Sequence, residues 1–175
     1  MNKKLTSILV ALILMALTTS TASAGGAVRL TRVEFSLGNS LDVSGILTGL
    51  GGYTDGVTVE LTAIGDPVVT CTSRGGNQAP GQNPSQVLAS GVQLITKIFK
   101  NGTAPVEVSA EPTLTGTQAG CPNNNWTANI DFVFWTHATI TVTDPSTDPD
   151  TVLLQQNYTC VTTRDPDNVS CMLVP

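Results

Sequence analysis

The chain has 175 residues and a formal net charge of −5 at pH 7, with 12% charged and 5% aromatic side chains. Such an acidic chain lacks the basic surface by which proteins bind nucleic acid or anionic membranes, so we expect neither partner. Its length suits one domain, large enough to bury most of its apolar surface.

Residues 1–24 have the pattern of a bacterial secretory signal peptide. Two lysines precede an apolar segment at residues 8–17, and Ala22-Ser23-Ala24 provides a small-residue cleavage site. The apolar segment is too short to span a bilayer, and no second one follows it. We therefore expect a cleaved signal peptide, secretion of residues 25–175 as a single extracellular domain, and no membrane insertion.

The remaining chain has the composition of strands. Thr and Val are frequent, and clusters of Gly and Pro recur at short intervals, which is typical of all-β proteins. The pattern predicts an all-β fold, an immunoglobulin-like antiparallel β-sandwich. The expected strands are residues 29–37, 41–48, 57–64, 68–72, 86–99 with a break near Gly91, 105–110, 126–143 and 151–163.

The segment 126–143 carries the clearest alternation of side chains. Successive side chains of a strand point to opposite faces, so residues of one parity share a face. The apolar parity, expected in the core, contains Trp126, Ala128, Ile130, Phe132, Phe134, Ala138, Ile140 and Val142, interrupted only by Thr136. The opposite parity contains Asp131, Trp135 and His137, so Trp135 is expected to be exposed.

The four cysteines predict two disulfides in an oxidising compartment. Three pairings are possible, and we favour Cys160 with Cys171, because the turn-forming segment 165–168 lets a strand fold back between them. Cys71 with Cys121 then follows by elimination. A zinc site is disfavoured because the chain contains no Cys-x-x-Cys spacing.

Two segments are rich in amide side chains. The first, GGNQAPGQNP at residues 75–84, contains Asn77, Gln78, Gln82 and Asn83, and the second, GCPNNNW at residues 120–126, contains Asn123, Asn124 and Asn125. If Cys71 and Cys121 are bonded, the two loops lie side by side. Their amides can brace irregular backbone or form a recognition surface, and the sequence leaves both interpretations open.

These two motifs resemble a group of small secreted proteins, mainly bacterial, that share GGNQAPGQNP and GCPNNNW and for which no function is known. The similarity extends over most of the chain after the signal peptide. The resemblance implies one secreted domain and brings no activity, cofactor or ligand with it.

No set of residues predicts catalysis. His137 is the only histidine, and Asp131 on the same strand face lies six residues away, about 20 Å along an extended strand. Cysteines in disulfides cannot act as nucleophiles. We expect no enzyme activity, no cofactor and no metal, and one alternative remains open: a weak calcium site in the loop with Asp144, Asp148 and Asp150.

Two functional hypotheses follow. The first is a secreted non-catalytic protein with a structural, cell-surface, matrix or adhesion role, which could self-associate or bind a cell-surface partner. The alternative is a carbohydrate-binding module, in which the amide-rich loops bind sugar hydroxyls and Trp135 provides a stacking face.

Overall fold

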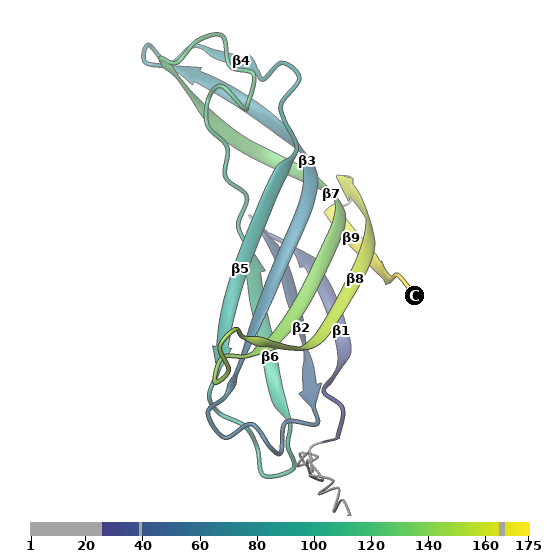
Figure 1. Ribbon diagram of the computed structural model, residues 1–175. Helices are drawn as coiled ribbons and strands as arrows, with labels where there is room; N and C mark the ends of the chain where they lie inside the picture. Colours follow the sequence, from purple (N-terminus) through teal and green to yellow (C-terminus); the bar gives the residue numbers. More distant parts are fainter. Residues whose placement is uncertain (1–25, 39, 165–166) are drawn as a thin grey trace, which may run out of the picture.

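The computed structural model describes residues 26–38, 40–164 and 167–175 (Figure 1). The expected signal peptide lies outside these residues. The described residues form nine strands and no helix, which confirms the predicted all-β class.

Two antiparallel sheets form a sandwich. The smaller sheet has the order β1 (Arg29–Leu37), β2 (Leu41–Thr48) and β6 (Ala104–Ala110). In the larger sheet, β3 (Val57–Ser73) pairs with β7 (Trp126–Asp144), followed by β8 (Thr151–Arg164) and β9 (Asp167–Leu173). On its other side β3 pairs with β5 (Val87–Ile95) and, near its end, with β4 (Gln78–Pro80).

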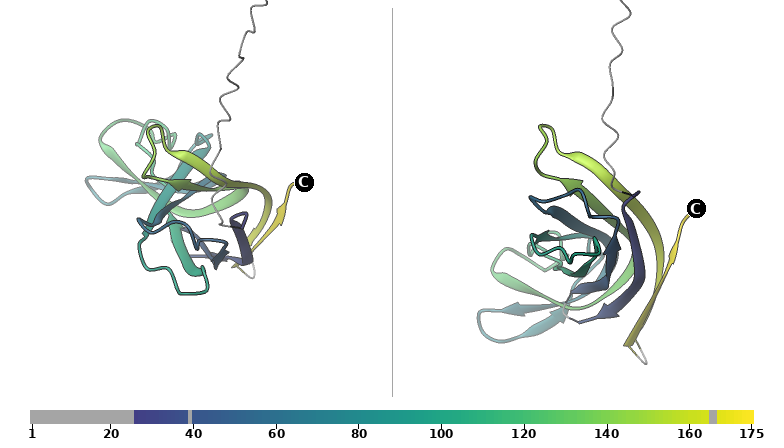
Figure 2. Two further views of the ribbon diagram at one scale, coloured as in Figure 1. Left: turned by 60° about the horizontal axis from the view of Figure 1, so that its bottom comes forward. Right: turned by 90° about the horizontal axis from the view of Figure 1, so that it is seen from below.

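The main core lies between the sheets and is built by alternation. Along β6 every second residue is buried, and β3 and β7 contribute residues in the same manner. The side chains with the least exposure include Leu41, Leu47, Leu61, Ile140 and Val142. At the open side, β8 and β9 curve round so that β9 lies beside β1 (Figure 2). Between β1 and β8, Phe35 stacks edge-to-face on Tyr158. Burial of Tyr158 raises the pKa of its phenol.

One correction concerns the strand expected at 57–64, which the structure continues through Pro67 to Ser73. Proline cannot donate to a ladder, and within sheets it is found at edges and bulges. Here Pro67 pairs with Val133 between two register shifts, at Ile64/Gly65 and at Val68/Val69. On the other side of β3, Pro67 lies between the ladder with β5, which ends at Gly65, and the ladder with β4, which begins at Thr70. The strands expected from the sequence also did not include the short strands β4 and β9.

The same two shifts overturn the predicted faces of β7. Thr136 and Asp131 have no ladder partner on β3. Each is an extra residue in β7, and each extra residue exchanges the two faces of that strand. Ala138, Ile140 and Val142 are buried as expected, but Val133 and Trp135 are buried in place of Phe132 and Phe134. Trp135 is only 2% exposed, so the prediction of an exposed Trp135 is wrong.

The predicted disulfides, Cys71–Cys121 and Cys160–Cys171, are both confirmed. Cys160 and Cys171 are paired neighbours on β8 and β9. Cys71 is on β3 and Cys121 in the loop that precedes β7, so neither disulfide connects the two sheets. The inter-sheet disulfide of antibody domains therefore has no counterpart here.

The two sheets meet along β5 and β6, where a glycine is required. Ser90 forms a bridge with Glu111, and the Gln93 Oε1 atom accepts a hydrogen bond from the Glu107 N–H at 2.9 Å. A Cβ atom on Gly91 would collide with the carbonyl oxygen of Ser109. The close approach of β5 to β6 therefore depends on the absence of a side chain at residue 91.

We predict that Gly91→Ala lowers the free energy of unfolding by about 1–3 kcal/mol, the usual cost of an extra methyl group in a packed site. Gly75→Ala is the matched control, because a Cβ atom there meets only side-chain atoms at 3.9 Å. Chemical denaturation of both variants measures the difference. Equal stability of Gly91→Ala and wild type would contradict this view of the sheet edge.

Candidate functional site

Beyond the sandwich, β3 and β7 continue together as a projecting arm (Figure 1). We define the arm as residues 66–86 and 112–134. Its ladder pairs Val69 to Ser73 with Ile130 to Trp126, and β4 covers the other edge of β3 through the pairs Thr70↔Pro80, Cys71↔Ala79 and Thr72↔Gln78. Because the arm is made of the same strands as the sandwich, it is a continuous extension of the sheet.

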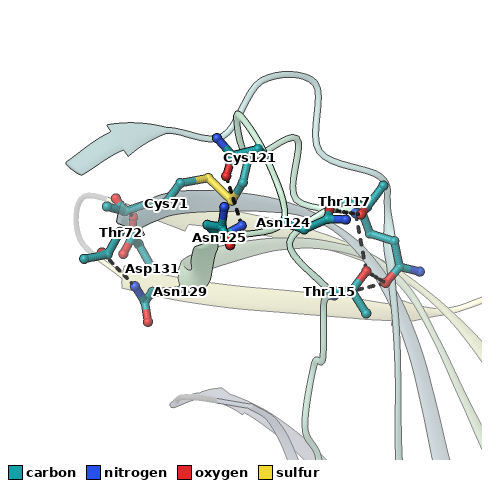
Figure 3. The surroundings of a disulfide bond; sticks show 12 residues. Cys71, Thr72, Thr115, Thr117, Cys121, Asn124, Asn125, Asn129 and Asp131 are labelled. Atoms are coloured by element: carbon teal, nitrogen blue, oxygen red, sulfur yellow. Dashed lines mark hydrogen bonds between the residues drawn. A yellow bond between two sulfur atoms is a disulfide. The ribbon is translucent and has the colours of Figure 1, made fainter. Parts of the chain in front are cut away.

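The arm has its own small hydrophobic core. Val69, Cys71 and Ala119 are buried there, with Leu114, Cys121, Trp126 and Ala128 packed around them. The Cys71–Cys121 bond, with 5.6 Å between its Cα atoms, joins the strand to the loop before β7 (Figure 3). Two cross-strand bonds lie nearby, since Thr70 donates to Asp131 at 2.6 Å and Asn129 donates to Thr72 at 3.2 Å. The tip of the arm is thereby fixed to its base.

Backbone N–H groups of the first amide-rich loop, residues 75–84, and its neighbours form hydrogen bonds within the arm. The Ser73 N–H donates to the Asn77 carbonyl at 2.8 Å, and the Gly81 N–H donates to the Val69 carbonyl at 2.8 Å. Further along, the Gln82 N–H donates to Gly120 at 3.1 Å and the Ser85 N–H donates to Gln118 at 2.8 Å. The loop is therefore packed against the second loop, as expected for loops joined by this disulfide.

Two glycines allow the loops to touch. A Cβ atom on Gly81 would collide with the Ala119 carbonyl, and one on Gly120 would collide with the backbone of Gln82. Gly120 also has a φ of +68°, a conformation that favours glycine. Both glycines are visible in the sequence. The need for glycine at these positions becomes apparent only when the two loop backbones are seen in contact.

Whereas the backbone of the first loop bonds to the rest of the arm, its amide side chains point to solvent. Asn77, Gln78, Gln82 and Asn83 are all exposed, and within the described ranges their side-chain amides make no hydrogen bond to the protein. The interpretation that these amides brace the loop is therefore wrong. Bracing comes from the backbone and from the Ser73 hydroxyl, which accepts a bond from the Asn77 N–H at 3.0 Å.

In the second loop the amides have mixed roles. The Asn123 Oδ1 atom accepts the Asn125 N–H at 2.9 Å, and Asn124 accepts a bond from the Thr117 hydroxyl at 3.4 Å (Figure 3). All three asparagines are exposed. The adjoining Trp126 is half-buried against the arm core, so Trp126, and not Trp135, has an indole surface near the amides.

The other candidate residues from the sequence, His137 with Asp131 and the aspartates of residues 144–150, do not form a catalytic or metal site in the described residues. His137 Nδ1 lies 3.1 Å from the Thr136 hydroxyl, while Asp131 is bonded to Thr70. In the Asp144–Asp150 loop, the hydroxyl and N–H of Ser146 donate to Asp144 at 2.6 and 2.9 Å and hold the pKa of that carboxyl below its usual value. Over the described part of the chain, no three His, Cys, Asp or Glu residues are grouped as a metal would require.

Comparison with protein-family models, with curated proteins and with solved structures found no significant match. Among the described residues, no helix has the length and apolar character needed to cross a membrane. Disulfides such as these two are typical of proteins that fold in an oxidising compartment.

We predict that replacing Cys71 and Cys121 together by alanine lowers the free energy of unfolding by about 4 kcal/mol, since the bond closes a loop of 50 residues. Replacing Cys160 and Cys171, which are 11 residues apart, serves as the comparison and should cost about 3 kcal/mol. Urea denaturation gives both values. A smaller loss in the first double variant than in the second would contradict the role of the arm disulfide.

Proposed function

We propose that this is a secreted, non-catalytic extracellular protein that acts as a structural or adhesive component of the cell surface or matrix. The leader pattern at residues 1–24 and the resemblance of the two loop motifs to secreted proteins support export. The two disulfides agree with that compartment. The described side chains offer no grouping of His, Cys, Asp and Glu on which a metal-dependent reaction could be based.

The projecting arm is the observation that carries an adhesive role. Its tip is held by a disulfide, a small core and backbone bonds between two loops. Its exposed amides therefore stand on a preorganised support. Preorganisation lowers the entropy cost of binding, so such a tip is suited to recognising a polar surface.

Carbohydrate recognition by the same tip is a second candidate, favoured by the free amides of Asn77, Gln78, Gln82 and Asn83. Each amide offers two donors and one acceptor, which complements sugar hydroxyls. The buried Trp135 cannot stack on a sugar ring. In this proposal the half-buried Trp126 takes that place.

We predict that the fourfold variant Asn77→Ala/Gln78→Ala/Gln82→Ala/Asn83→Ala loses at least about tenfold in affinity for cells or cell-wall material, because several amide hydrogen bonds of roughly 1 kcal/mol each are removed. Asn101→Ala/Asn168→Ala, which removes exposed amides elsewhere, is the control and should bind like wild type. Sedimentation of labelled protein with cells or walls measures binding, and melting temperatures verify folding.

A glycan array with the same three proteins and with Trp126→Ala distinguishes the two candidates. Binding of wild type but not the fourfold variant to defined sugars supports the carbohydrate-binding module, and loss with Trp126→Ala would locate the stacking face. Binding to cells without binding to any sugar supports the structural or adhesive role. If wild type binds neither cells nor walls nor sugars, both proposals fail.

A further inference from the structure

The outer face of the larger sheet collects most of the exposed apolar side chains. Eleven large apolar residues are exposed in the described ranges, and the registers place eight of them on this face. These eight are Ile64, Leu88, Val92, Leu94, Phe134, Val152, Val161 and Met172. The face is distinct from the tip of the arm.

The ladder arranges this face in rows that cross the sheet. One row runs Leu88, Ile64, His137, Thr159 and Met172, from β5 to β9. The next rows are Ser90, Thr62, Thr139 and Asn157, then Val92, Glu60, Thr141 and Gln155, then Leu94, Thr58, Thr143 and Val152. These four rows contain one carboxylate, Glu60, and no Lys or Arg.

The outer face of the smaller sheet is different. Between its buried residues it presents Arg29, Glu34, Asp42 and Glu107. Charged side chains are the ordinary means by which exposed strands avoid association. The contrast within one molecule shows that the larger sheet lacks this protection on its outer face.

On β5 the apolar side chains form a stripe that no other part of the described structure covers. Leu88 is 68% exposed, Val92 65% and Leu94 60%. Ile64 extends the stripe onto β3, since it is the ladder partner of Leu88. Along β5, Ser90 separates Leu88 from Val92 and Leu94. Exposed apolar side chains gathered on one face in this way mark an interaction site in soluble proteins.

We propose that this face packs against the same face of a second copy of the chain, with the β5 stripe at the centre of the contact. The dimensions approach those of a dimer interface: four strands carry all four rows, and at about 4.8 Å per strand and roughly 25 Å along the strands they give about 480 Å² per copy, to which Met172 on β9 adds. Each partner in a standard interface buries about 600–1,000 Å². The pairing is isologous, as in most homodimers.

The charge distribution permits a second copy as the occupant on this face and disfavours it on the charged faces. The chain has a net charge of −5, so two copies repel each other when charged faces approach. The nearly uncharged face allows close approach. A flat glycan would require aromatic platforms, and the only aromatic ring of these eight residues, Phe134, is 37% exposed. An anionic membrane would require Lys or Arg, which the rows lack.

The test is sedimentation equilibrium of the oxidised, exported protein as a function of concentration. Wild type should approach twice the monomer mass, and Leu88→Lys and Val92→Lys should each raise the dissociation constant at least about tenfold, because each places a charge in a desolvated contact. Both positions are exposed, so the variants should keep the fold and the melting temperature that wild type shows at concentrations where it is monomeric. Leu173→Lys is the control: this residue is 52% exposed, on the opposite parity to Met172, and its variant should dimerise like wild type.

His137, the only histidine, provides a second readout on the same face. Its imidazole NMR signals should shift with protein concentration in wild type and in Leu173→Lys, but not in Leu88→Lys. A wild type that stays monomeric at the highest soluble concentration overturns the proposal. So does a dimer unaffected by Leu88→Lys and Val92→Lys, or an imidazole shift that appears only when glycans or lipid vesicles are added. The tip amides are intact in these variants, so failure here leaves the proposed function untouched.

Discussion

The ladder between β3 and β7 is the interaction on which the rest of the structure depends. It runs from the pair Thr58↔Thr143 to the pair Ser73↔Trp126 and belongs to both the sandwich and the arm. In the sandwich it places Leu61 and Ile140 in the core, and in the arm it places Cys71 beside Ala119. Two register shifts lie between these regions. Each exchanges the faces of β7, and together they cancel, so the same faces of β3 and β7 line both cores.

The ladder also determines what the protein presents to its surroundings. At its far end it carries the two loops whose backbones bond to each other, and the side-chain amides of the first loop are exposed there. Along its middle it displays an outer face of threonine and aliphatic side chains with one carboxylate in four rows. In our proposals the tip recognises a surface and the sheet face holds two copies together.

Much of this architecture could be predicted from local sequence signals. The bounds of β1 and β2 agree with the expected strands, and the spacing of the cysteines led to both disulfides. The faces of β7 could not be predicted, because alternation alone does not show where a strand takes an extra residue: Thr136 has no ladder partner on β3, and the shift there buries Trp135. The amide-rich loops were recognised from sequence, but the direction of their side chains depends on Gly81 and Gly120 meeting the facing backbone.

The register of this ladder is tested most directly by tryptophan fluorescence of Trp126→Phe, in which Trp135 is the only remaining tryptophan. With Trp135 only 2% exposed, we predict a blue-shifted emission that resists acrylamide quenching and changes to that of exposed indole on unfolding. The reciprocal variant Trp135→Phe, which retains the half-buried Trp126, should be quenched more readily. A red-shifted, freely quenched emission from Trp126→Phe in the folded protein would contradict the two register shifts and the account built on them.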